Sequence, residues 1–116
     1  MDTKKEWINY CLTRGGVYED YPFDDPNWAV MRHAANRKAF AFVYERGGGL
    51  CLNLKCSPAL ADFLRRQYKS LAPGYHMNKE HWNTVTVGGD VPDDEIKGLI
   101  VHSYELTKPK IKTYPK

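Results

Sequence analysis

The sequence predicts one two-layer α+β domain, an antiparallel sheet of about five strands with three helices on one face, in the order α-β-β-β-β-α-β-α. Three observations predict it. Apolar residues recur at helical spacing in three segments and alternate with period two in the segments between them. Clusters of Gly, Pro and Asp separate these segments. The length of 116 residues and the 42% apolar content suit a single domain with one core.

The first helix is predicted to begin after Thr3. Thr3 and Glu6 match a capping box, in which each side chain bonds a free backbone amide at the start of the helix. Trp7, Ile8, Cys11 and Leu12 then follow at helical spacing, and Gly15-Gly16 ends the helix.

Four strands are predicted next, and they form an antiparallel meander with one face buried. Aromatic residues alternate with Ala and Val from residue 39 to residue 45, and Leu alternates with polar or small residues from residue 50 to residue 55. Arg46-Gly47-Gly48-Gly49 between them is predicted to be a hairpin loop. The four predicted strands are residues 17–23, 28–32, 39–45 and 50–55.

Ser57-Pro58 is predicted to start the second helix, with Ser as N-cap and Pro in the first turn, and residues 71–74 are predicted to end it. A fifth strand is predicted over residues 82–87. Pro92, followed by three acidic residues that favour the positive end of a helix, begins the third. We expect the domain to span residues 1–106 and the basic segment 107–116 to be a mobile tail.

The composition limits the classes of function. The formal charge of +3 permits a polyanionic partner without requiring one. Three cysteines, an odd and low number, suit a reducing compartment, and the N-terminus does not resemble a signal peptide. No apolar run is long enough to span a membrane. We therefore expect a cytoplasmic protein that does not bind membranes.

No catalytic or metal site is predicted, and we expect a protein that is not an enzyme and has no cofactor. His76 and His81 match no common metal-ligand spacing. Cys56 precedes a helix start, where a thiolate is favoured, but no histidine is placed to activate it. The acidic residues of segment 19–25 match no calcium-binding loop.

Residues 73–85 form the densest unusual segment, with a cation, two histidines, two amides and two aromatic residues between a helix and a strand. Lys79 is suited to a phosphate, Asn78 to hydrogen bonding, and Tyr75 or Trp82 to stacking on a base. A purely structural role, with the aromatic rings covering the sheet, is equally compatible with the sequence.

This segment, together with others, resembles the MmcQ/YjbR family of small bacterial proteins over about residues 3–106. The matching stretches are residues 7–12, 19–23, 54–58, 64–65, 73–85, 91–93 and 103–104. The resemblance implies a CyaY-like α+β fold and DNA binding through a double-wing motif, with no enzymatic reaction. It places the family site at Lys55, Asn78, Lys79 and Trp82. The iron binding of related frataxin-like proteins is disfavoured, because Lys4 and Lys5 occupy the first helix.

The leading hypothesis is therefore a DNA-binding module in which Lys55 and Lys79 contact phosphates, with a steep dependence of affinity on salt. Its predicted nucleic-acid-binding residues are Lys55, Arg65, Arg66, Lys69, His76, Asn78, Lys79, His81 and Trp82. An alternative is a protein-interaction or chaperone-like module that binds a peptide on an aromatic surface formed by Trp28, Tyr44 and the aromatic loop of residues 75–82. A third is a small-ligand pocket lined by Tyr75, His76, Lys79 and Trp82.

Overall fold

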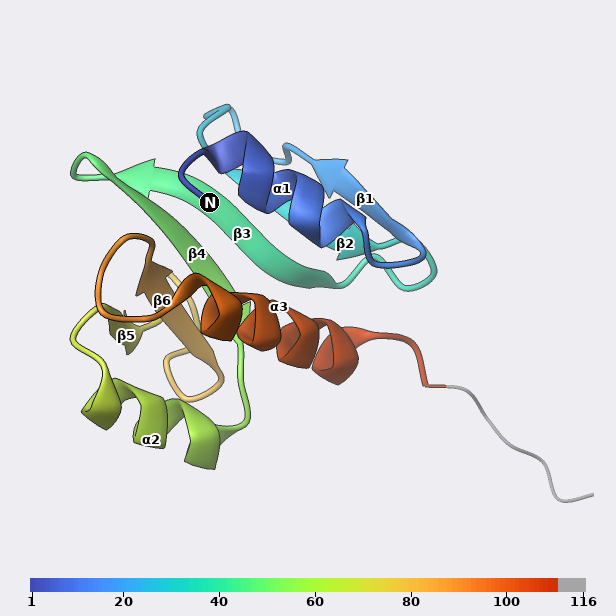
Figure 1. Ribbon diagram of the computed structural model, residues 1–116. Helices are drawn as coiled ribbons and strands as arrows, with labels where there is room; N and C mark the ends of the chain where they lie inside the picture. Colours follow the sequence, from blue (N-terminus) through green and yellow to red (C-terminus); the bar gives the residue numbers. More distant parts are fainter. Residues whose placement is uncertain (111–116) are drawn as a thin grey trace, which may run out of the picture.

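The structure is a computed structural model that describes residues 1–110, and it confirms the α+β fold (Figure 1). The elements in chain order are α1 (Lys4–Leu12), β1 (Val17–Asp20), β2 (Ala29–His33), β3 (Ala39–Arg46), β4 (Gly49–Lys55), α2 (Pro58–Gln67), β5 (Leu71–Pro73), β6 (Trp82–Thr86) and α3 (Asp93–Thr107). Among the described residues, no helix is long and apolar enough to cross a membrane.

The sheet has six strands in the spatial order β1-β2-β3-β4-β6-β5, and every neighbouring pair is antiparallel. The additional strand is β5, in which Leu71 pairs with Val85. The prediction that residues 71–74 only end the second helix was therefore incomplete. Three residues are too few to show a period-two pattern, so this strand is defined by its pairing with β6.

All three helices contribute to one core on one face of the sheet. Trp7 of α1, Ala61 of α2 and Ile100 of α3 are all fully buried in the same apolar cluster as Leu52 of β4. Figure 1 shows α1 and α3 lying across this face, with α2 beside β5. Within the described part of the chain, no helix packs on the other face of the sheet.

A β-bulge between β2 and β3 places Phe40 on the opposite face of the sheet from the one predicted. The pairing of β2 with β3 shifts register between Met31 and Arg32. Phe40 consequently lies in the core with Ala41, whereas the sequence pattern predicted that it shares a face with Phe42 and Tyr44. This leaves Phe42 and Tyr44 on the uncovered face.

The start of α1 follows the predicted signal. The capping box forms as predicted, because the amide of Glu6 donates to Thr3 Oγ1 and the amide of Thr3 donates to the Glu6 carboxylate. Helix α2, in contrast, ends at Gln67, before the predicted stop at residues 71–74, and Ser57 at its N-cap makes no side-chain capping bond. Helix α3 continues one residue beyond the predicted domain end, to the buried Thr107. Most of the predicted mobile tail, including Lys112 and Lys116, lies outside the described residues.

Candidate aromatic binding site

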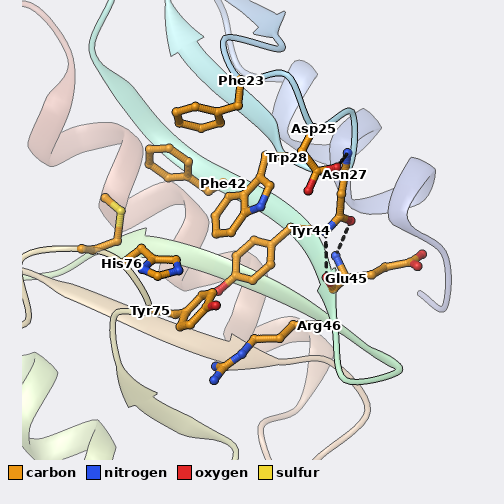
Figure 2. A pocket seen from close by; sticks show the side chains of 11 residues that line it. Phe23, Asp25, Asn27, Trp28, Phe42, Tyr44, Glu45, Arg46, Tyr75 and His76 are labelled. Atoms are coloured by element: carbon orange, nitrogen blue, oxygen red, sulfur yellow. Dashed lines mark hydrogen bonds between the residues drawn. The ribbon is translucent and has the colours of Figure 1, made fainter.

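A concavity of about 580 Å³ opens on the uncovered face of the sheet. Its lining comes from three separate segments, and we call it the aromatic pocket (Figure 2). The lining residues are Phe23, Asp25, Asn27, Trp28, Phe42, Tyr44, Glu45, Arg46, Tyr75, His76 and Met77. Its volume falls within the range of ligand-binding pockets, about 300–1,000 Å³.

Stacked aromatic rings form the centre of the pocket. Trp28 stacks on Tyr44, with ring centroids 3.9 Å apart and planes 14° from parallel. Phe23 and Phe42 contact Trp28 edge-on, at 6.2 and 6.4 Å. Tyr44 is fully buried, whereas Trp28 is only partly buried. One face of the Trp28 ring therefore packs on Tyr44, and part of the Trp28 side chain stays accessible to solvent.

A buried network of hydrogen bonds joins Tyr75, which lines one side of the pocket, to the sheet. Asn53 Oδ1 accepts hydrogen bonds from the Tyr44 hydroxyl at 2.7 Å and from Thr84 Oγ1 at 2.6 Å. Asn53 Nδ2 donates to the Tyr75 carbonyl at 2.9 Å, and the Tyr75 amide donates to Thr84 Oγ1 at 2.8 Å. Burial raises the pKa of Tyr44, so its hydroxyl stays protonated and keeps donating. The network thus ties Tyr75 to β4 and β6.

The backbone of this wall is tightly constrained. A Cβ atom at Gly74 would lie 2.8 Å from Trp82 Cβ and 3.0 Å from both Met77 Cβ and the Trp82 carbonyl oxygen, so only glycine fits. His76 adopts a left-handed conformation with φ of 59°, which is uncommon for a residue with a side chain. Such strained positions are concentrated at functional sites. The conformation places the His76 ring against Tyr75, with centroids 3.9 Å apart.

Arg46 forms the rim of the pocket beside the β3–β4 hairpin. Gly47 and Gly48 both have positive φ, 60° and 80°, as a two-residue hairpin turn requires, and Arg46 pairs with Gly49 across it. This confirms the predicted hairpin. The Arg46 guanidinium carbon lies 3.7 Å from the Tyr75 ring centroid, a cation–π contact.

The turn before β2 forms the opposite rim. Asn27 Nδ2 donates to the Glu45 carbonyl and Asn27 Oδ1 accepts from the Glu45 amide, both at 2.8 Å (Figure 2). Asp25 Oδ1 accepts from the Asn27 amide at 2.9 Å, and the Asp25 carbonyl accepts from the Trp28 amide at 3.2 Å. These bonds hold Trp28 in place. Asp25 lines the pocket, and among the described residues its second carboxylate oxygen accepts no hydrogen bond.

Three polar groups in the pocket are available to a ligand. Within residues 1–110, Tyr75 forms hydrogen bonds only through its backbone, and neither Trp28 Nε1 nor the His76 ring has a hydrogen-bond partner. A concave apolar surface with a few free polar groups is the usual form of a small-ligand site. The aromatic pocket is therefore the best candidate for a binding site among the described residues.

Arg65, one of the predicted nucleic-acid-binding residues, supports the loop between β5 and β6. Its Nε donates to Asn83 Oδ1 at 2.6 Å, and one terminal nitrogen donates to the carbonyls of Lys79 and Trp82, the latter at 3.1 Å. These bonds occupy much of the guanidinium edge. Arg65 therefore holds the loop that carries Tyr75 and His76.

The Asn78-Lys79 corner is also engaged inside its own loop. Asn78 Oδ1 accepts from the Glu80 amide at 3.0 Å, and the Asn78 carbonyl accepts from the Trp82 amide at 3.0 Å. The Lys79 ammonium donates to the Gly74 carbonyl at 3.2 Å, although the residue is exposed. The Lys79 ammonium thus contacts the backbone next to Tyr75.

The remaining predicted residues are spread around this loop and α2. Trp82 contacts Phe42 edge-on at 5.6 Å and pairs with Lys55 across β4 and β6. Arg66 forms an exposed ion pair with Asp62 at 3.1 Å, and His81 lies 4.0 Å from the Glu80 carboxylate. The Lys69 amide donates to Asp90 at 2.8 Å. Of the nine predicted residues, His76 alone lines the aromatic pocket.

The third hypothesis, a pocket beneath the loop, is partly matched by the structure. Tyr75 and His76 line the pocket as predicted, whereas Lys79 and Trp82 do not. Most of the lining comes from residues that the sequence analysis did not assign to this pocket, notably Asp25 and Arg46. The sequence did indicate part of this lining, because Trp28 and Tyr44 were assigned to the aromatic surface of a protein-interaction module.

Cys56 is poorly suited to thiolate chemistry. Burial raises the pKa of the Cys56 thiol, although Arg65 acts in the opposite direction. The same effect raises the pKa of the buried Cys11 to about 12. All three cysteines are buried and free.

Most of the chain is similar to proteins of one family. The family model named YjbR matches residues 12–106. YyaQ of Bacillus subtilis is 34% identical over 119 residues, which cover 93% of this chain and 100% of that protein. YjbR of Escherichia coli K12 is 34% identical over 103 residues, which cover 89% of this chain and 85% of that protein.

Solved structures of similar proteins have the same fold. The crystal structure of DR2400 from Deinococcus radiodurans aligns with a TM-score of 0.82 at 34% identity, covering 91% of this chain and 78% of that one. A crystal structure of a Pseudomonas syringae protein aligns with a TM-score of 0.81 at 32% identity, covering 91% of this chain and 99% of that one.

Proposed function

Because this chain belongs to the YjbR family, which the sequence analysis linked to DNA binding, we propose that it binds DNA by taking an unpaired base into the aromatic pocket. The observation that carries the proposal is the accessible Trp28 ring, which is stacked on the buried Tyr44. A rigid aromatic surface of this kind binds bases of any sequence, with about 1–3 kcal/mol per stacked base.

The polar groups of the pocket suit the edge of a base. Trp28 Nε1 is a donor, the Tyr75 hydroxyl can donate or accept, and the free Asp25 oxygen accepts from an amino group or ring N–H. A purely apolar ligand would leave these groups without hydrogen-bond partners. A heteroaromatic ring with donors and acceptors on its edge fits better.

Phosphate contacts contribute less than the sequence alone predicted. Arg65 and Arg66 are already engaged by carbonyls and by Asp62. We propose Lys55 and Lys79 as the phosphate contacts, because Lys55 pairs with Trp82 and the Lys79 ammonium, which donates to the Gly74 carbonyl, has two further donors. Each phosphate contact on a single strand contributes a slope of about −0.7 in log affinity against log salt. We therefore expect a shallow salt dependence, with a slope of about −1 to −2.

The proposal is tested by titrating labelled single-stranded and duplex oligonucleotides and measuring fluorescence anisotropy. Trp28→Ala is expected to weaken single-strand binding at least tenfold, which corresponds to about 1.4 kcal/mol of lost stacking. Phe63→Ala is the matched control, because Phe63 is an exposed aromatic residue on α2, outside the pocket. Equal losses in the two variants, or tighter binding of the duplex, would argue against base capture.

A second candidate function is favoured by one observation. Tyr21 and Phe23 are 45% and 52% exposed, and Phe23 extends the apolar surface of the pocket outward. Large exposed apolar residues beside a pocket also mark protein-interaction surfaces. In this case an aromatic side chain of a partner peptide occupies the pocket, and binding is insensitive to salt and to added oligonucleotide.

A further inference from the structure

Arg46 is a cation with unused hydrogen-bonding capacity inside a pocket whose other features suit a planar ring. Among residues 1–110, no carboxylate lies within ion-pair distance of its guanidinium. Its guanidinium carbon lies over the Tyr75 ring, and within residues 1–110 its N–H donors have no hydrogen-bond partner. A planar fork of donors is the group that binds phosphate with two parallel hydrogen bonds.

The surroundings of Arg46 keep these donors accessible. A Cβ atom built at Gly47 or Gly48 would meet nothing within 4 Å, so the turn beside Arg46 is open. The preceding residue, Glu45, projects to the opposite side of the strand, and Figure 2 shows its carboxylate directed away from the aromatic rings. Asp25, the other acid of the pocket, lies toward its Trp28 end (Figure 2).

The two ends of the pocket therefore differ in charge, with stacked rings between them. A ligand that fills both the ring site and the Arg46 end must carry an aromatic ring and an anionic group on one molecule. We propose that Arg46 makes the pocket selective for a nucleoside phosphate, with the base on the aromatic rings and the phosphate on the guanidinium. This inference rests on the proposed function and specifies the ligand of the same site.

Two kinds of molecule carry a nucleoside phosphate, namely a free nucleotide and a DNA strand. Isothermal titration calorimetry with deoxyadenosine, deoxyadenosine 5′-monophosphate and a short deoxyadenosine oligonucleotide distinguishes them. Wild-type protein is expected to bind the monophosphate about tenfold more tightly than the nucleoside, the range of a charge-assisted hydrogen-bonded pair. An oligonucleotide affinity well above that of the monophosphate would identify the strand as the source, and equal affinities would identify the free nucleotide.

Arg46→Ala is expected to remove the preference for the monophosphate, and Arg46→Lys to retain only part of it, because lysine keeps the charge and loses the fork. Lys5→Ala is the control, since Lys5 is an exposed cation on α1, outside the pocket. Thermal melting of each variant checks that it is folded.

The outcomes separate the two proposals. Equal affinity of wild-type protein for nucleoside and monophosphate, or an unchanged preference in Arg46→Ala, would overturn the role of Arg46 and leave base capture standing. Oligonucleotide binding that is unaffected by Arg46→Ala, with no binding of either small compound, would overturn it as well. Absence of binding by all three compounds would overturn both proposals.

Discussion

The Arg46 guanidinium lies 3.7 Å from the centre of the Tyr75 ring, so that the β3–β4 hairpin meets the loop between β5 and β6. This contact joins segments about thirty residues apart in the sequence and closes one side of the aromatic pocket. Tyr75 is in turn tied to β4 by the bond from Asn53 Nδ2 to its carbonyl. The geometry of the pocket therefore depends on a few residues that can be tested one by one.

Asn53→Ala is predicted to destabilise the fold and loosen the pocket wall. The substitution leaves the buried Tyr44 and Thr84 hydroxyls without their acceptor, which costs about 1–3 kcal/mol in the free energy of unfolding. Urea denaturation measures this loss. Asn9→Ala, on the exposed side of α1, is the control and should change stability by less than about 0.5 kcal/mol. Equal stabilities of the two variants would contradict the structural role of the network.

Gly74→Ala is predicted to lower stability by about 1–3 kcal/mol, because the new Cβ would press on Trp82 and Met77. Gly98→Ala provides the opposite case, since a Cβ there has free space and lies within α3. Alanine in a helix is favoured over glycine by about 0.8–1.0 kcal/mol, so this variant should be more stable. Thermal and urea unfolding compare both with the wild type, and a neutral Gly74→Ala would refute the tight packing of the wall.

Arg65→Ala is predicted to loosen the loop between β5 and β6 by removing the hydrogen bonds to Asn83 and to the Lys79 and Trp82 carbonyls. Amide hydrogen exchange should become faster over residues 75–82, while α1 is unaffected. Arg66→Ala removes the same charge from an exposed ion pair and should leave exchange unchanged. If both variants exchange like the wild type and instead lose equal affinity for DNA, Arg65 acts as a phosphate contact.

His33 is predicted to make stability dependent on pH. The Thr107 hydroxyl donates to the Ser103 carbonyl, so its oxygen accepts from His33 Nε2 at 2.9 Å. Burial lowers the pKa of His33 below its usual 6.5, which means that the folded protein favours the neutral ring. The stabilising contribution is therefore complete above pH 6.5 and is lost as the pH falls through the lowered pKa.

Urea unfolding midpoints between pH 8 and pH 5 measure this dependence. His33→Gln, which can still donate to Thr107 but does not titrate here, should show a flatter profile over this range. An identical decline in the variant and the wild type would assign the effect to other groups.

Much of the fold could be predicted from local sequence. Thr3 and Glu6 marked the start of α1, and Gly47-Gly48 marked the hairpin, because capping boxes and tight turns depend on residues that are close together in the chain. Strand β5 was missed because Leu71–Pro73 is too short to show a period. Phe40 was assigned to the wrong face because the bulge that turns it depends on the partner strand.

The candidate binding site was harder to predict for a physical reason. Asn78 and Lys79 were predicted to bind by their residue type, but in the structure one ammonium donor of Lys79 and the Asn78 side-chain oxygen form hydrogen bonds within their own loop. The aromatic pocket instead combines residues 23–28, 42–46 and 75–77, which only the tertiary structure brings together. Arg46 was recognised as part of a turn, but its contact with Tyr75 could not be read from the sequence.

The most direct test of base capture follows the tryptophan indole N–H resonances by NMR as a single-stranded oligonucleotide is added, with assignments from single Trp→Phe variants. Trp7 is an internal reference, because it is fully buried and its Nε1 donates to the Met1 carbonyl at 3.2 Å. We predict that the Trp28 signal shifts saturably while the Trp7 signal stays fixed. A Trp28 signal that does not move, while the oligonucleotide binds elsewhere on the protein, would contradict the account.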